Sequence, residues 1–245
     1  MKASAAKDLG RRVADLLQNG QTEAAYGLLT PILAERTPFR WLDRLASAIG
    51  GAAPPVLANN LLERIAQDRT MGGWVVMAGV LRPQLKRDAA GVMNRCQALI
   101  VRADVWYAAD IFGERLPGPS LVLNFKPTLD LLAPWRKDVN RWVRRTVGVA
   151  IHFWAKRSGG APDLNAQAET LLTFLEPMFE EWDLDAVKGI GWGLKTLGRF
   201  YPELLTNWLA RRVIPEHGRI RALMLRKALT NLSDDQRARA TGSTS

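Results

Sequence analysis

The stretch NRWVRRTVGVAIHFWAKR, residues 140–157, decides the fold class because its apolar residues recur at the period of an α-helix. On a wheel of about 100° per residue, its apolar and basic residues fall on different sides. The apolar side comprises Val143, Val147, Ala150 and Trp154, and the basic side comprises Arg141, Arg145, His152 and Lys156. The stretch therefore predicts a helix with one packed face and one basic face.

Other segments have the same helical period, and none alternates convincingly as a strand would. Apolar helix centres lie at 74–81, 105–112, 142–151, 186–194 and 220–229, and clusters of turn-forming residues break the pattern at 19–21, 49–55, 115–120, 156–163 and 213–218. The centres are spaced by roughly 32 to 45 residues, near the spacing of HEAT or armadillo helix pairs. We therefore predict an all-α fold, an α-solenoid of HEAT-like antiparallel helix pairs with a concave basic groove. An irregular helical bundle is the alternative.

The length of 245 residues suits one large domain or two small ones. The recurring helices favour a single HEAT-like repeat domain over 1–235, followed by a flexible C-terminal tail over 236–245. The segment RLPGPS at 115–120 is interpreted as a turn between two helices, since it lacks the second glycine of a helix-hairpin-helix motif.

The chain is strongly basic, with 34 Lys and Arg against 24 Asp and Glu, a formal net charge of +10 and a sequence pI of about 10.2. Such a balance is typical of proteins that bind a polyanion, although net charge can also serve solubility alone. The nine tryptophans against three tyrosines add large aromatic surfaces that could contact a ligand.

The segment DAVKGIGWGLKTLGRFY, residues 185–201, repeats the pattern of a packed face beside a basic face. Its core stripe comprises Val187, Ile190, Leu194, Leu197 and Tyr201, and another face carries Lys188, Trp192, Lys195 and Arg199. A tryptophan among cations is typical of a groove in which Lys and Arg neutralise phosphates while the indole packs against a sugar or base. For the charges alone, a solvated face is the alternative.

A carboxylate shares a helical stripe with a tryptophan in RADVWYAADIFGERL, residues 102–116. The core stripe there comprises Val105, Ala109, Phe112 and Leu116, whereas Trp106 and Asp110 project together from a neighbouring face. A carboxylate in a basic groove repels phosphate. Asp110 therefore either pairs with Arg102 or Arg145, or stabilises a cationic transition state and activates a water.

Several classes of site are disfavoured by the composition. The single Cys96 allows no disulfide framework, and His152 and His217 form no zinc-binding spacing, so we expect neither a metal nor another cofactor. No apolar run reaches the length of a membrane span, and the start lacks a signal-peptide core. We expect no membrane association and a cytoplasmic location.

Three segments together resemble the AlkD-like DNA glycosylases, the HEAT-repeat DNA alkylation repair family. They are WYAAD at 106–110, NRWVRR at 140–145 and VKGIGWGLKTLGRFYPE at 187–203, and the resemblance covers roughly residues 60–235. It implies that Asp110 is the catalytic carboxylate and that Trp106 and Trp192 are aromatic walls of the cleft. It also implies that Arg145 holds a backbone phosphate.

The reaction implied by the resemblance is hydrolysis of the N-glycosidic bond of positively charged N3- or N7-alkylated purines in duplex DNA. Such an enzyme is a monofunctional hydrolase of base excision repair, with the transition state of a glycoside hydrolysis. We expect a monomer that is nucleoid-associated when bound to DNA. Further DNA-binding candidates are Arg141, Lys156, Lys188, Lys195 and Arg199.

The N-terminal third does not match the family pattern, so the third aromatic wall is unassigned among Tyr26, Trp41 and Trp74. The rival interpretation is a noncatalytic HEAT-repeat module that binds DNA or an acidic protein partner. It explains the charge and the tryptophans equally well, and Asp110 alone argues against it. Arg211, Arg212, Arg219 and Arg226 could extend a phosphate track or form a solvated surface.

Overall fold

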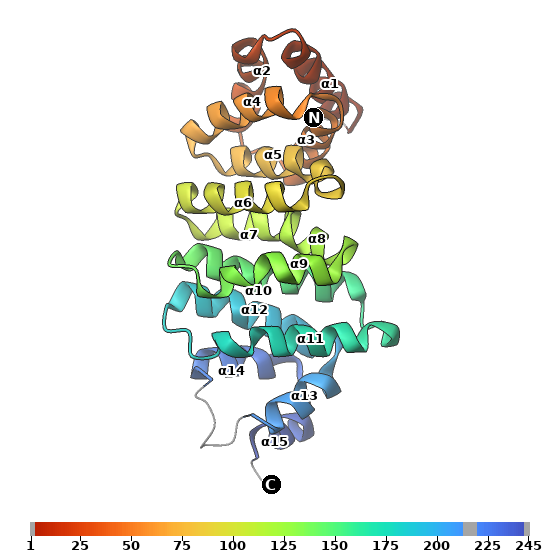
Figure 1. Cartoon of the computed structure of the whole chain (residues 1–245), viewed down its shortest axis with the longest axis vertical. Coiled ribbons are helices and arrows are strands. Elements are labelled where there is room, and N and C mark those ends of the chain that lie inside the picture. The colour runs from red at the N-terminus through yellow and green to blue at the C-terminus, as the bar shows by residue number, and fades with distance from the viewer. Residues whose placement is uncertain (1–2, 213–219, 243–245) are drawn as a thin grey trace. The chain divides into compact units, whose positions relative to one another are not determined.

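A computed structural model describes residues 3–212 and 220–242, and the regular structure within these ranges is entirely helical (Figure 1). The all-α prediction is thereby confirmed. The helix centres predicted at 74–81, 142–151 and 186–194 lie within single helices. The break predicted at 213–218 lies outside the described residues.

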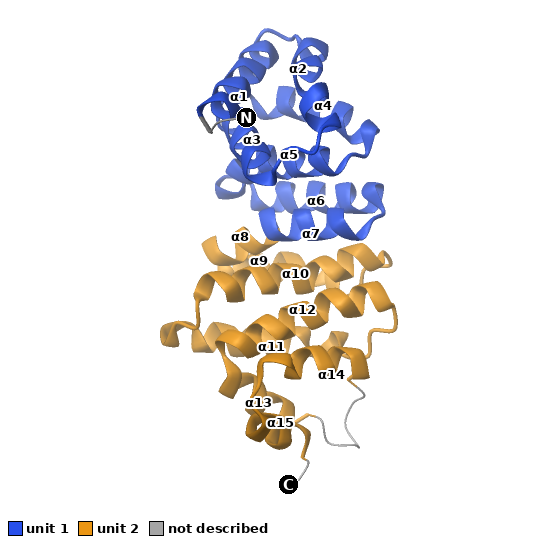
Figure 2. Cartoon of the chain, turned by 180° about the vertical axis from the view of Figure 1, so that it is seen from behind, with its two compact units in different colours: residues 1–116 blue, residues 117–245 orange. Residues whose placement is uncertain are grey.

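The chain divides into two compact units, which Figure 2 colours separately: unit 1 is Met1–Leu116 and unit 2 is Pro117–Ser245. Each unit is described by itself below. The single repeat domain over 1–235 stays a prediction, because this division concerns packing and not independent folding.

Unit 1 stacks its helices in two layers. The odd-numbered helices α1, α3, α5 and α7 pack against one another in succession, and α2 and α4 pack against each other and against this row. The bounds are α1 Ala3–Gln18, α2 Thr22–Ala34, α3 Phe39–Ala52, α4 Pro55–Asp68, α5 Met71–Leu81, the 3₁₀ turn η1 Arg82–Lys86, α6 Ala89–Ala103 and α7 Trp106–Arg115.

Small residues let the odd-numbered helices of unit 1 approach closely. A Cβ on Gly10 of α1 would lie 2.4 Å from the carbonyl oxygen of Leu45, and one on Gly50 of α3 would lie 2.2 Å from that of Val80. Farther along, Gln18 donates a hydrogen bond of 3.1 Å to the carbonyl of Ala52. Contacts thus advance in the same direction along α1 and α3, so these two helices run parallel.

Unit 2 contains α8 Pro117–Leu123, α9 Phe125–Leu132, η2 Pro134–Lys137, α10 Arg141–Ser158, η3 Pro162–Leu164, α11 Asn165–Leu175, η4 Glu176–Met178, α12 Leu184–Phe200, α13 Pro202–Ala210, α14 Ala222–Ala228, η5 Leu229–Asn231 and α15 Asp234–Thr241. Its best-packed helices are α10, α12 and α14, which lie side by side in that order. These three helices carry most of the basic residues singled out from the sequence.

Glycines bring the backbones of α10 and α12 into contact. A Cβ on Gly148 would lie 2.3 Å from the carbonyl oxygen of Gly189, and one on Gly193 would lie 2.7 Å from that of Gly148. Neither position has room for a larger side chain. The glycine run of the segment 185–201 therefore sets how closely these two helices pack.

The predicted turn between two helices is present at Leu116, between α7 and α8, but its predicted extent over 115–120 is wrong because α8 already begins at Pro117. Proline is tolerated in the first turn of a helix, where its missing N–H would have no helical partner. A buried hydrogen bond of 2.8 Å between the hydroxyls of Ser120 and Thr128 then ties α8 to α9. Here the prolines start a helix, whereas the sequence pattern predicted that the turn would continue to residue 120.

The flexible tail predicted from residue 236 is also wrong as far as residue 241, because these residues belong to α15. Ser233 and Gln236 form a capping box, in which each side chain bonds to the backbone N–H of the other. Arg239 also donates hydrogen bonds of 3.0 Å to both carboxylate oxygens of Glu203 on α13. Residues 243–245 lie outside the description.

Candidate nucleic-acid interface

The predicted catalytic pair lies on α7 in unit 1. Trp106 is the first residue of the helix and is 54% exposed, and Asp110, one turn later, is half-buried. The indole meets the ring of Tyr107 edge to face, with centroids 5.7 Å apart. The exposed indole is therefore accessible to a ligand.

The opposite face of α7 is packed, as its helical period predicts. Ala109, Phe112 and Leu116 are fully buried, and the ring of Phe112 lies 6.1 Å from that of Trp74 on α5. Val105 was predicted to belong to this stripe, but it is the extended N-cap residue and is only half-buried. The packing fixes which side of α7 presents Trp106 and Asp110.

The core stripe predicted for α10 is confirmed, since Val143, Val147, Ala150 and Trp154 are all buried. The basic face is confirmed only in part. Arg141 and Lys156 are exposed, whereas Arg145 and His152 are each only 8% exposed.

Arg145 is buried because α12 lies against its side of α10. A Cβ on Gly189 would lie 2.6 Å from Cγ of Arg145, so the arginine stem fills the space that the glycine leaves. The guanidinium donates a hydrogen bond of 3.0 Å to the carbonyl of Asp185. The helical wheel gave the direction of this side chain, but not the distance to the neighbouring helix.

Arg144, the other arginine of WVRR, holds together the loops that lead into α10 and α12. Its guanidinium donates to both carboxylate oxygens of Glu181, at 2.5 and 3.1 Å, and this ion pair is buried. It also donates to the carbonyls of Asp138 and Val139, at 2.7 and 3.1 Å. Arg144 therefore fixes the start of both helices and does not form part of a binding face.

The two predicted faces of α12 are confirmed. Its core stripe from Val187 to Tyr201 is buried, whereas Lys188 and Arg199 are exposed and Trp192 and Lys195 are half-buried. At the start of the helix, Asp185 lies 3.4 Å from Lys188 and 3.9 Å from Arg141. One acidic side chain therefore lies between two of the predicted DNA-binding cations.

Trp192 stacks on His152 of α10. The ring centroids are 3.9 Å apart and the planes are inclined by 26°, and Nδ1 of His152 lies 2.7 Å from the hydroxyl of Thr196. The sequence placed His152 among solvent-facing cations. In the structure it instead fixes the orientation of the Trp192 ring.

A further cation, Lys227 of α14, joins those of α10 and α12. Desolvation lowers the pKa of its ammonium, and the charges of Lys195, Arg145, Lys188 and Arg226 lower it further. The sequence analysis did not single out Lys227, although it lies in the predicted helix 220–229. What could not be foreseen is that α14 packs on the basic helix α12.

The three candidates for a further aromatic wall differ in accessibility. Trp74 is buried and therefore cannot line a cleft. Tyr26 is half-buried and donates a hydrogen bond of 2.6 Å to Asp68, and Trp41 is half-buried beneath the guanidinium of Arg40. Both Tyr26 and Trp41 remain candidates.

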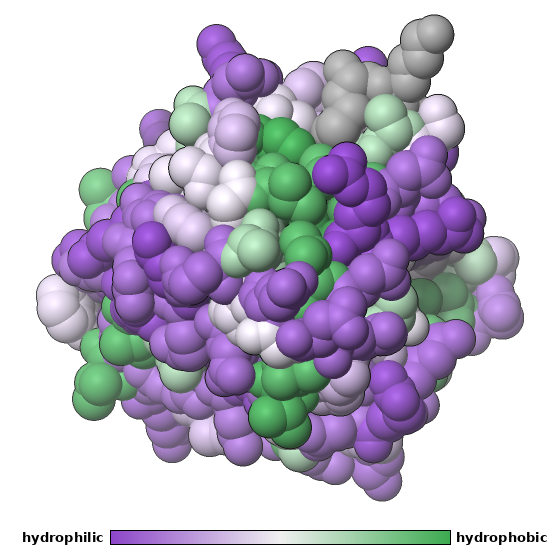
Figure 3. All heavy atoms as spheres, turned by 90° about the horizontal axis from the view of Figure 1, so that it is seen from above, coloured by the Kyte–Doolittle hydropathy of each residue, from purple (hydrophilic) through white to green (hydrophobic). Residues whose placement is uncertain are grey.

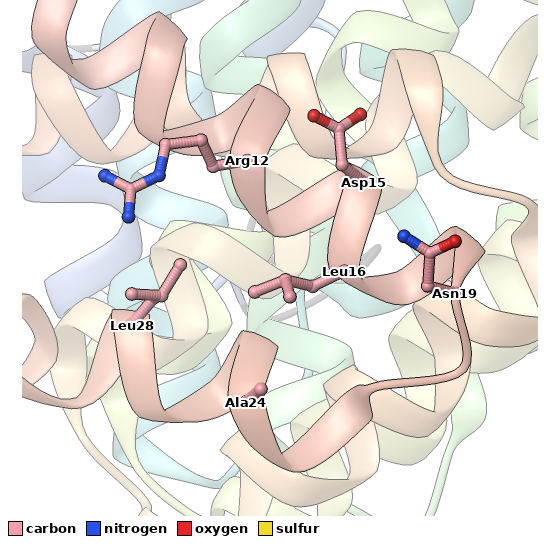
Figure 4. A pocket seen from close by; sticks show the side chains of 6 residues that line it. All are labelled: Arg12, Asp15, Leu16, Asn19, Ala24 and Leu28. Carbon is pink, nitrogen blue, oxygen red and sulfur yellow. The ribbon is translucent and has the colours of Figure 1, made fainter.

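The α1–α2 end of unit 1 offers little for a specific ligand. A narrow band of hydrophobic residues crosses an otherwise mostly hydrophilic face there (Figure 3). An open cavity of about 440 Å³ lies between the two helices. Leu16 and Leu28 extend towards each other across it, whereas the polar ends of Arg12, Asp15 and Asn19, which also line it, are spread around its edge (Figure 4). It therefore lacks the converging polar groups that would orient a ligand.

Among residues 3–212 and 220–242, no three His, Cys, Asp or Glu side chains lie close enough together to hold a metal ion. Within the same ranges, no helix is long and apolar enough to span a membrane. Cys96 is fully buried, and burial raises the pKa of its thiol, which keeps it protonated and unreactive.

Comparison with known proteins identifies a family. The model of a family described as DNA alkylation repair enzyme matches residues 56–232, which include α7, α10, α12 and α14. No curated protein and no solved structure gives a significant match to the chain.

Proposed function

The chain belongs to the family of DNA alkylation repair enzymes, and from that premise we propose that it is a DNA glycosylase. It releases positively charged N3- or N7-alkylated purines from duplex DNA. Membership of the family gives the chain a role in the repair of alkylated DNA. The proposal adds the reaction, its substrates and the residues that perform it.

The observation that carries the proposal is the pairing of Trp106 with Asp110 on α7. The indole is exposed and the carboxylate follows one turn later, on a helix whose other face is anchored in the core of unit 1. A fixed carboxylate beside an aromatic ring suits a reaction in which the sugar becomes cationic. In a site that only bound phosphates, a negative charge would repel the ligand.

The chemistry needs little more than this carboxylate. As the bond between C1′ and the purine nitrogen breaks, its electron pair neutralises the charge of the alkylated base, and the deoxyribose becomes an oxocarbenium-like cation. Asp110 stabilises that cation electrostatically and orients a water molecule. The water oxygen bonds to C1′, its proton passes to the carboxylate or to solvent, and an abasic site remains. At about 4 Å, an ion pair is worth about 4 kcal/mol at an effective dielectric constant of 20.

The cations of unit 2 contact the DNA backbone in this proposal. Arg141, Lys156, Lys188, Lys195 and Arg199 supply exposed or half-exposed charge, and Arg145 adds a buried positive charge near the start of α12. Trp192, held by its stack on His152, offers an aromatic face to the DNA. Such contacts position the duplex and do not read its sequence.

The test is the release of free base from a duplex that contains 7-methylguanine. The purified protein is incubated with this duplex and with an undamaged duplex of the same sequence, and the released bases are identified by mass spectrometry. We expect 7-methylguanine to be released and an abasic site to remain in an otherwise intact strand.

The rival candidate is a noncatalytic module that binds DNA or an acidic protein partner, and the basic face of unit 2 favours it equally. Binding of either duplex without base release, under conditions in which the protein is folded, would exclude the glycosylase and support this alternative.

A further inference from the structure

Lys227 lies on top of α12, between two lysines of that helix. A Cβ on Gly191 would lie 2.6 Å from Cδ of Lys227 and 3.2 Å from its Cβ, so the lysine stem crosses the helix at this glycine. Lys188 lies one turn before Gly191 and Lys195 lies one turn after it. The ammonium of Lys227 is therefore brought towards a row of cations that its own helix does not supply.

Two contacts hold α14 in this position. Asn231 donates a hydrogen bond of 2.8 Å from its side chain to the carbonyl of Lys195. A Cβ on Gly198 would lie 3.1 Å from the carbonyl oxygen of Ala228, so the two helices also approach closely at their far ends. The backbone positions that carry the cations are thus set by packed helices and not by flexible loops.

The electrostatics of the cluster are unfavourable in the free protein. Beyond desolvation, Lys195, Arg145, Lys188 and Arg226 all lower the pKa of Lys227. Asp185 lies 3.4 Å from Lys188 and offsets part of the charge at the N-terminal end of α12. Like charges held together in this way repel one another until an anion joins them.

We propose that Lys227 and Arg226 of α14, together with Lys188 and Lys195 of α12, form a site for the phosphates of a duplex DNA backbone. This assignment rests on the DNA-binding part of the proposed function, and it adds Lys227, which the sequence analysis did not single out. Lys188 and Lys195 lie seven residues apart, which spans about 10 Å along a helix. Several phosphates of one strand fall within that length.

A regularly charged polyanion fits this site better than an acidic protein segment does. The cations follow two packed helices and their spacing is fixed, which matches a backbone of evenly spaced charges. Trp192 lies on the same face of α12 as Lys188 and Lys195 and adds an aromatic surface to the row of cations. Aromatic side chains among cations are typical of nucleic-acid surfaces.

The first experiment measures how the binding of undamaged duplex DNA depends on salt. It compares wild type, Lys227→Gln and the matched control Lys126→Gln, which removes an exposed lysine from α9. For Lys227→Gln, we expect the slope of log K against log salt to fall by about one unit. We expect Lys126→Gln to keep the wild-type slope. Because undamaged DNA is used, the result does not depend on base release.

A second experiment locates the contact directly by acetylating lysines of the folded protein with and without undamaged duplex and quantifying the modified peptides by mass spectrometry. We expect duplex DNA to protect Lys227 from acetylation and to leave Lys126 unprotected.

An unchanged salt slope for a folded Lys227→Gln protein would overturn the site, even if base release were observed. Protection of Lys227 by polyglutamate, without protection by DNA, would assign the cluster to an acidic protein and equally overturn the proposal. A reduced salt slope for Lys227→Gln, combined with no base release by wild type, would support the phosphate site and refute only the glycosylase.

Discussion

At the scale of single residues, Trp106 and Trp182 allow a controlled comparison, because both are exposed tryptophans and only one lies beside a carboxylate of proposed function. Trp106 is 54% exposed on α7, one turn before Asp110, whereas Trp182 is 73% exposed in the loop before α12. The two side chains lie in different units. Replacing each in turn separates a specific contact with the nucleotide from a general loss of aromatic surface.

We predict that Trp106→Ala slows the release of 7-methylguanine by about tenfold or more, which corresponds to about 1.4 kcal/mol. Trp182→Ala leaves the rate unchanged, and neither substitution lowers the thermal midpoint of unfolding appreciably, since both rings are exposed. Single-turnover measurements on the same duplex check this. Equal rates for the two variants would remove Trp106 from the site.

Lys227 provides a prediction about stability. Its lowered pKa means that the folded protein binds the proton more weakly than the unfolded chain does. The free energy of unfolding therefore rises with pH between the folded-state pKa and the ordinary lysine pKa. Below this window Lys227 is charged in both states, and its charge destabilises the folded protein in full. Removing the charge by Lys227→Gln should raise the melting temperature at neutral pH and low salt by about 1 °C.

Differential scanning fluorimetry checks this rise against Lys126→Gln, which should not show it. The gain should shrink in high salt, because salt screens the repulsion. A lower melting temperature for Lys227→Gln at low salt would show that the lysine stabilises the free protein, contrary to a cluster of repelling charges.

A helical period shows which residues share a face of a helix, but it does not show which other helix packs against that face. The buried stripes of α10 and α12 were predicted correctly because period alone determines which residues share a face. The burial of Arg145 and His152 was missed because it depends on α12, and the approach of α12 depends on the glycine contact between Gly148 and Gly189. A run of glycines in the sequence indicates that another helix packs closely there, but it does not indicate which helix.

At the scale of elements, the start of α10 and the start of α12 are joined by one buried ion pair. Arg144 and Glu181 bond to each other, to the carbonyls of Asp138 and Val139 and to the N–H of Asp183. Asp183 in turn caps α12 by accepting from the N–H groups of Asp185 and Ala186. The pair therefore fixes where both helices begin, and with them the positions of Arg141 and Lys188.

We predict that Arg144→Met lowers the free energy of unfolding by about 3–5 kcal/mol, because it leaves the carboxylate of Glu181 buried without its cation. The double variant Arg144→Met with Glu181→Leu should recover most of this loss, since no uncompensated charge remains. Urea unfolding of the two variants and wild type measures both quantities. A loss of less than about 1 kcal/mol in the single variant would contradict a structural role for this pair.

The two errors of the sequence prediction at this scale have a common origin in local signals. RLPGPS was interpreted as a turn because prolines and a glycine usually break helices, yet Pro117 occupies a helix start, where proline is tolerated. The C-terminal residues were interpreted as a tail because they are polar, yet Ser233 and Gln236 carry the spacing of a capping box. The capping box was visible in the sequence, whereas the prolines were compatible with either a turn or a helix start.

At the scale of the whole molecule, the two proposed roles belong to different units. Unit 1 carries the carboxylate proposed to perform the chemistry, and unit 2 carries the cations proposed to hold the DNA backbone. Binding and catalysis should therefore be separable by substitutions in different units. Loss of charge on α12 or α14 should weaken binding of any duplex, whereas loss of the carboxylate on α7 should affect damaged DNA alone.

The most direct test of the central claim is the release of 7-methylguanine from duplex DNA by wild type and Asp110→Asn, with the affinity of each for the same duplex measured in parallel. The amide keeps the size of the side chain and removes the charge that stabilises the sugar cation. The account predicts that Asp110→Asn binds the duplex about as tightly as wild type and releases at least a hundredfold less base. Base release by Asp110→Asn at the wild-type rate would contradict it.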